Sequence, residues 1–150
     1  MNATETQTRL KEEHAALQAF VGLLEREQQI LLAPDTEPLL ELSHEKTRAA
    51  EALLALVKKR AQYLPAESEK IEAWLRSNAA TSLGVWQDIQ RMGEQAQQLN
   101  KTNGELIQVR MRYNQQALQA LLGAAEQTAG LYDTKGKTNM PGSGRTLGSG

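Results

Sequence analysis

The stretch TQTRLKEEHAALQAFVGLLEREQQILLA, residues 6–33, decides the fold of this chain. Four of its leucines recur every seven residues. Together with one residue between each pair they are spaced alternately by four and three residues, and residues at this spacing lie along one side of a helix. Phe20, Leu23 and Ile30 widen this stripe beyond the seam of a two-stranded coiled coil. The stretch therefore predicts a helix that packs against more than one neighbour. The stripe consists of Leu10, His14, Leu17, Val21, Leu24, Gln28 and Leu31.

Prolines divide the chain after this helix into further helices. The short loop from Pro34 to Pro38 makes the helices on either side of it antiparallel neighbours. Helix-forming residues dominate, and no stretch alternates as a strand does. We therefore predict an all-α fold, an elongated antiparallel helical bundle or coiled coil with a long C-terminal helix and a flexible tail. The helices are predicted at about 6–33, 38–63, 66–77 and 83–128, within a helical domain of residues 1–129, and the tail is predicted at 130–150, with a partner-binding start.

The composition argues against several classes of function. The 150 residues include 17 basic and 18 acidic ones, so the net charge of −1 favours neither nucleic acid nor an anionic membrane as a partner. The chain has no cysteine, which removes disulfides and thiolate metal sites. No apolar run approaches the roughly 20 residues that span a bilayer, and the first residues lack the layout of a secretory signal. A cytoplasmic protein without stable membrane insertion is expected.

Three motifs resemble chemical sites, and each has a plainer explanation. Residues 130–138 carry two glycines and a lysine like a phosphate-binding loop, but the glycines are one residue too far apart and no strand precedes them. Glu41 and His44 have the spacing of a di-iron bundle, but His14, the only other histidine, lacks the matching glutamate. The basic cluster 58–60 lacks interleaved aromatics and is expected to be a solvated helix end. No enzyme activity, cofactor or metal site is expected.

Two stripes run side by side along the predicted last helix. One keeps the four-and-three rhythm over residues 85–117 and includes Asn103, and the other runs over residues 100–121. Asn100 and Asn114 lie in the second stripe, where leucine would pack better. Either these asparagines fix the alignment of packed helices, or the stripe faces a groove that a partner helix fills, so that its polar groups stay solvated in the free protein. The sequence leaves both interpretations open.

The last third of the chain carries a more specific pattern. Its parts are L-N-x-x-N-G-x-L-I at 99–107, Tyr113-Asn114, Ala117-Leu118, Leu121, and Leu131-Tyr132 shortly before Gly136. This pattern resembles the C-terminal signature of FlgN-type flagellar export chaperones. The resemblance implies a small helical cytoplasmic chaperone that binds hook-filament junction (hook-associated) proteins as clients and delivers them to the flagellar type III export gate. It also implies that the C-terminal region binds the client and that Tyr132 docks on the gate.

The residues expected to contact partners lie on the last helix and just after it. Tyr132 has a second interpretation, as an anchor that packs the helix end onto the bundle. The alternative class is a non-catalytic coiled-coil adaptor that self-associates through the leucine seam of residues 10–31, and a homo-oligomer remains open for either class. The expected partner-binding residues are Asn100, Ile107, Met111, Asn114, Leu118, Leu121, Leu122, Leu131 and Tyr132.

Overall fold

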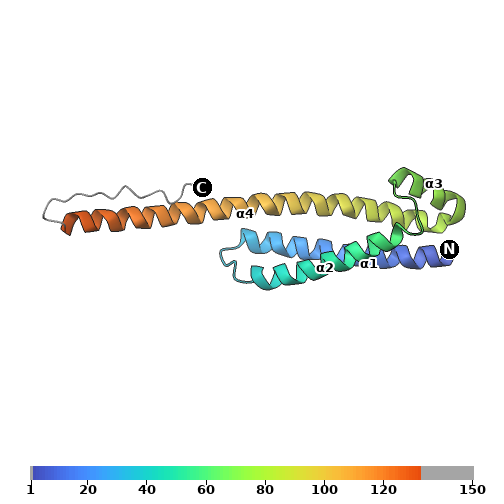
Figure 1. The fold of residues 1–150 in the computed structure, drawn as a ribbon, viewed down its shortest axis with the longest axis horizontal. Coiled ribbons are helices and arrows are strands. Elements are labelled where there is room, and N and C mark those ends of the chain that lie inside the picture. Colours follow the sequence, from blue (N-terminus) through green and yellow to red (C-terminus); the bar gives the residue numbers. More distant parts are fainter. Residues whose placement is uncertain (1, 133–150) are drawn as a thin grey trace. The chain divides into compact units, whose positions relative to one another are not determined.

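The computed structural model describes the backbone of residues 2–132 and the side chains of residues 2–114. The elements are α1 (Ala3–Leu32), α2 (Leu39–Arg60), α3 (Ser68–Asn78), a short 3-10 turn η1 (Ala80–Ser82), and α4 (Leu83–Tyr132) (Figure 1). No strand occurs between residues 2 and 132. The predicted all-α bundle and its long C-terminal helix are confirmed. Residues 133–150, which make up most of the predicted tail, lie outside the described residues.

The helix ends differ by a few residues from those predicted. Helix α1 begins at Ala3 because the Asn2 side chain caps it: Asn2 Oδ1 accepts a hydrogen bond from the Glu5 backbone N–H at 2.8 Å. Helix α2 ends at Arg60 rather than near residue 63, because turns replace it over the next residues. Helix α4 continues to Tyr132, beyond the predicted end near residue 128.

The chain divides into two compact units, residues 1–104 and 105–150. The first unit contains α1, α2, α3, η1 and the first part of α4. The described backbone of the second unit is the rest of α4, from Glu105 to Tyr132. The boundary falls after Gly104, within a helix that is continuous along the chain.

The hydrophobic core of the first unit gathers on α1, which supplies four fully buried or nearly buried apolar side chains. Helix α3 and the first part of α4 cover it with their own apolar residues. Each fully buried leucine or isoleucine stabilises the fold by roughly 1.5–3 kcal/mol relative to exposure. The buried members are Leu10, Leu17, Val21, Leu24, Leu64, Ile71, Leu75, Ala79, Trp86, Ile89 and Ala96.

Two ion pairs whose carboxylates are buried fix the register between α1 and α2, which lie side by side and antiparallel (Figure 1). Arg60 Nε donates to both carboxylate oxygens of Glu13, at 2.8 and 3.2 Å. Lys46 Nζ donates to both carboxylate oxygens of Glu27, at 3.0 and 2.9 Å. Glu27 lies fourteen residues after Glu13, and Lys46 lies fourteen residues before Arg60, so both pairs belong to one antiparallel register. The spacing corresponds to about 21 Å along the helices.

These ion pairs correct the stripe predicted for α1. Glu13 and Glu27 are only 3% and 7% exposed, whereas His14 and Gln28, which the prediction placed in the stripe, are half-buried. Each buried carboxylate is accommodated because α2 brings a cation to it.

The basic cluster at the end of α2 also differs from its prediction. Lys58 and Lys59 are exposed as expected. Arg60 turns inward, where it binds Glu13 and lies over the Trp86 ring with its guanidinium carbon 4.9 Å from the ring centroid. The prediction of a solvated helix end is therefore wrong for Arg60, which joins α2 to both α1 and α4.

Candidate functional site

Besides the apolar core contacts, one buried amide joins the first part of α4 to α1 by hydrogen bonds. Asn103 is 1% exposed, and its Nδ2 donates to the Leu24 carbonyl oxygen and to Glu27 Oε1, both at 2.9 Å. Glu27 in turn accepts from Lys46 of α2. A continuous polar network therefore connects α4, α1 and α2 near the end of the first unit.

Asn103, not Asn100, is thus the asparagine that aligns packed helices. Asn100 is exposed, and so is Asn114. Neither is therefore buried at a seam between helices of this chain, whereas Asn103, which the prediction did not single out, is. The signal available in the sequence was the position of Asn103 in the stripe that packs, in phase with Ala96 and Leu99.

The second unit presents large apolar side chains to solvent. Between Glu105 and Asn114, four of them are between 38% and 71% exposed. Ile107 and Met111 are four residues apart and share one face of the helix with Asn114, while Val109 and Tyr113 share another. Single exposed leucines are common on protein surfaces, but four large apolar residues within seven positions of one helix form a dense group. The exposed fractions are 38% for Ile107, 52% for Val109, 57% for Met111 and 71% for Tyr113.

The other predicted partner contacts lie farther along the same helix. Their backbone is helical, but their side chains lie outside those described. The partner-binding role of the whole set remains a prediction. The residues concerned are Leu118, Leu121, Leu122, Leu131 and Tyr132.

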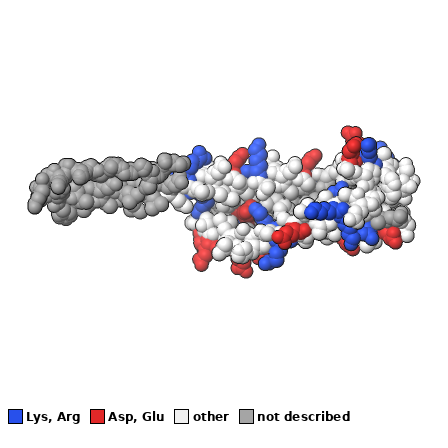
Figure 2. Space-filling view, in the orientation of Figure 1, with Lys and Arg blue, Asp and Glu red and all other residues white. Residues whose placement is uncertain are grey.

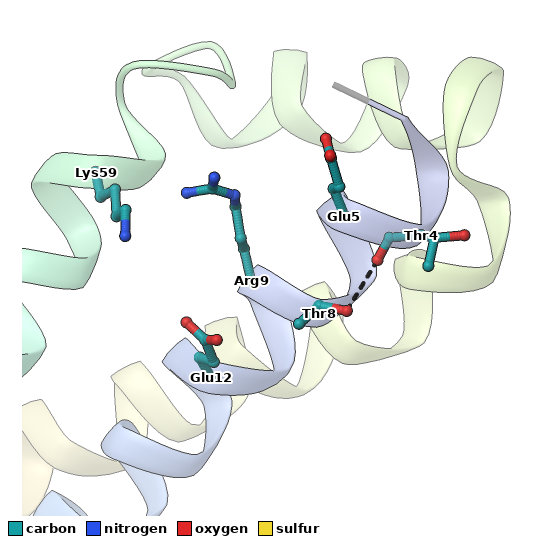
Figure 3. A pocket seen from close by; sticks show the side chains of 6 residues that line it. All are labelled: Thr4, Glu5, Thr8, Arg9, Glu12 and Lys59. Carbon is teal, nitrogen blue, oxygen red and sulfur yellow. Dashed lines mark hydrogen bonds between the residues drawn. The ribbon is translucent and has the colours of Figure 1, made fainter.

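An open recess of about 310 Å³ lies between the start of α1 and the end of α2 (Figure 3). Charged side chains of both signs line it: Arg9 and Lys59 direct their cationic ends into the hollow, and the Glu12 carboxylate faces it from the next turn of α1. Its Thr8 hydroxyl donates to the Thr4 carbonyl oxygen at 3.0 Å. The lining thus combines two carboxylates, Glu5 and Glu12, with the two cations and two threonines.

Burial affects the ionisation of one tyrosine beside this recess. Desolvation raises the pKa of the Tyr63 hydroxyl above its ordinary value of 10.0, and the nearby Glu13 carboxylate raises this pKa further. The guanidinium carbon of Arg9 lies 5.4 Å from the centroid of the Tyr63 ring, and the charge of Arg9 acts to lower this pKa. This environment is structural, because Tyr63 packs against the hydrophobic core.

The residues weighed as metal ligands do not come together. His44 and Glu41 are exposed on α2. His14 is on α1, where its Nε2 lies 4.0 Å from Oδ2 of Asp88 on α4. Within the described part of the chain, no three histidine or acidic side chains are grouped as a metal site would require. Over the first unit, basic and acidic side chains are interspersed on the face shown in Figure 2.

The leucine seam invoked for a self-associating adaptor is already occupied. Leu10 and Leu24 are 0% exposed, and Leu17 and Leu31 are 6% and 3% exposed, within the first unit. These side chains are not free to pair with a second chain unless the unit opens. The exposed apolar side chains of α4 are the better candidate for an interaction surface.

Four of the seven large apolar side chains that are exposed among residues 2–114 lie on α4, and an exposed apolar group on one helix of a bundle is typical of helical proteins that bind other proteins. The family model described as FlgN protein matches residues 1–140, and the chain belongs to the FlgN family. This family is one of flagellar export chaperones, so the chain has a general chaperone role in flagellum biogenesis. Comparisons with curated proteins and with solved structures gave no match. None of the helices that the structure describes has the length and apolar character needed to cross a bilayer.

Proposed function

We propose that this protein is a cytoplasmic chaperone that binds hook-filament junction proteins and delivers them to the flagellar type III export gate. Family membership supports the general role, and the observation that carries the client-binding step is the exposed apolar group on α4. Ile107 and Met111 expose large apolar side chains on one face of the helix and Val109 and Tyr113 on another, and an amphipathic segment of a client covers one such face on binding.

The chemistry of this surface suits clients that fold on contact. Ile107 and Met111 form a narrow apolar stripe, and methionine adapts its shape to different partners. Asn100 and Asn114 flank the stripe and are exposed, so they remain hydrated in the free chain and are available for hydrogen bonds to a partner. Binding at micromolar strength corresponds to about 8 kcal/mol, and ordering a disordered client opposes it by roughly 2–5 kcal/mol. A few leucines, isoleucines or methionines covered on each side are sufficient for such an interface.

The later residues extend this surface in the proposal. Leu118, Leu121 and Leu122 follow Ile107 and Met111 at helical spacing, and they are proposed as further client contacts. Leu131 and Tyr132 end α4 and are proposed as the contact with the export gate.

Calorimetry with the full chain and the C-terminal segment of a hook-filament junction protein tests the client-binding step. Replacing Ile107 and Met111 together by glutamine is expected to weaken binding at least tenfold. Each of these side chains contributes roughly 1.5–3 kcal/mol when a partner covers it, and a loss of about 1.4 kcal/mol is a factor of ten in affinity. Leu54→Gln is the matched control, since Leu54 is 52% exposed on α2. Equal losses for the two variants, or no binding by the unaltered chain, would overturn the proposal.

A further inference from the structure

The exposed part of α4 combines its apolar residues with an unusual local charge. Between Glu105 and Glu126 the chain has no acidic residue, and it has two arginines, Arg110 and Arg112. The whole chain, by contrast, has a net charge of −1 and nearly equal numbers of acidic and basic residues. Residues 106–125 are thus the longest stretch without an acidic residue before the C-terminal tail. The same residues include the surface proposed for the client.

The two arginines lie at different places on the helix surface. Arg110 is half-buried and falls in the stripe of Leu106 and Tyr113, at steps of four and three residues. Arg112 is exposed and lies on the polar side of the helix, four residues after Gln108. Arg112 lies about 100° further round the helix than Met111, so a partner that covers Ile107 and Met111 meets this positive charge at the rim of the contact.

We infer that the client segment recognised by α4 is an amphipathic one whose apolar stripe is flanked by acidic residues. This inference rests on the proposed function and adds the charge of the partner to it. Opposite charges at the rim of an interface speed association and exclude partners with the wrong charge, while the apolar contacts supply most of the affinity. Basic clients would meet Arg112 with like charge, so the same surface selects against them.

A protein segment fits this surface better than an anionic membrane does. Helices that lie on anionic membranes carry many lysines and arginines on their polar face. The polar side chains of this segment are mainly amides, and residues 113–125 contain no charged residue. Amides next to apolar residues suit hydrogen bonding to a peptide partner.

The test uses the full chain and three synthetic amphipathic peptides of about three heptads with the same leucine stripe. Their flanking positions carry glutamate, glutamine or lysine, and binding is followed by the anisotropy of a dye on the peptide. We expect the glutamate peptide to bind about two- to fivefold more tightly than the glutamine peptide through Arg112, and the lysine peptide to bind most weakly. Raising the ionic strength to about 1 M should abolish the difference, because screening then acts within about 3 Å.

Arg112→Gln should reduce the preference for the glutamate peptide, and Arg48→Gln, which removes an exposed arginine of α2, should not. Equal binding of all three peptides, or tightest binding of the lysine peptide, would overturn the charge rule while leaving the apolar surface in place. Absence of binding by every peptide would overturn the proposed client surface as well. Binding to phosphatidylserine vesicles that is lost in Arg112→Gln would replace the protein partner by a membrane and also overturn the inference.

Discussion

Removing the cation of a buried ion pair should severely destabilise the first unit. Arg60→Met leaves the Glu13 carboxylate, which is 3% exposed, without the donor that lies 2.8 and 3.2 Å from its two oxygens. Breaking a buried pair in this way costs about 3–5 kcal/mol, and the contact of Arg60 with the Trp86 ring, at 4.9 Å, is also lost. Domains of this size are stable by about 5–15 kcal/mol, so the change removes a large part of the total.

Urea unfolding followed by far-UV circular dichroism measures this loss. Arg26→Met is the matched control, because the Arg26–Glu45 pair joins the same two helices at 3.5 Å with the Arg26 side chain 57% exposed. Surface pairs of this kind contribute about 0–1 kcal/mol. Combining Glu13→Leu with Arg60→Met should recover most of the loss, since no charge is then left buried. The reasoning is refuted if Arg60→Met costs no more than Arg26→Met, or if the double change is worse than the single one.

Three further predictions concern other residues of the chain. Asn103→Ala should lower the free energy of unfolding in urea by about 1–3 kcal/mol, because Leu24 and Glu27 each lose a buried hydrogen bond. The control Asn100→Ala, at an exposed position, should change it by less than about 0.5 kcal/mol, and similar costs for the two variants would contradict the aligning role of Asn103. Absorbance at alkaline pH should show one tyrosine that ionises late and is missing in Tyr63→Phe. Because the folded pKa of Tyr63 lies above 10.0, its contribution to stability is present below pH 10 and is lost as the pH rises through the raised value; if the tyrosine lost in Tyr63→Phe is instead one that ionises near pH 10, the burial effect is contradicted. Tyr132→Ala should leave the helical content and the melting temperature unchanged while weakening contact with the export gate, and a large fall in melting temperature would instead identify Tyr132 as an anchor.

The class of fold could be predicted from the sequence because leucine periodicity and proline punctuation are local signals. The seven-residue leucine spacing and the short loop between Pro34 and Pro38 were enough to predict an antiparallel pair of helices. The buried face of α1 was predicted only in part. The prediction selected apolar positions, and Glu13 and Glu27 are buried although they are charged. A comparison of the two helices would have revealed these buried pairs. Glu13 and Glu27 are fourteen residues apart on α1, and their partners Arg60 and Lys46 are fourteen residues apart in the opposite direction on α2.

The candidate site could be predicted only in part for a similar reason. Periodicity identified the stripe that contains Ile107 and Met111, and both side chains are exposed in the structure. Periodicity alone could not distinguish which of two neighbouring stripes packs, so the aligning role was considered for Asn100 and Asn114 and not for Asn103. That distinction depends on where the Leu24 carbonyl and the Glu27 carboxylate of α1 lie, which is a tertiary property.

Hydrogen exchange of the full chain with and without the C-terminal segment of a hook-filament junction protein most directly tests the claim that α4 binds the client. We expect the amides from Glu105 onward in α4 to exchange more slowly in the complex, because binding covers and orders this helix. Exchange in α2, which carries the exposed Leu40 and Leu54, should stay unchanged. Protection confined to α1 and α2, with exchange beyond Glu105 unaltered, would contradict the claim.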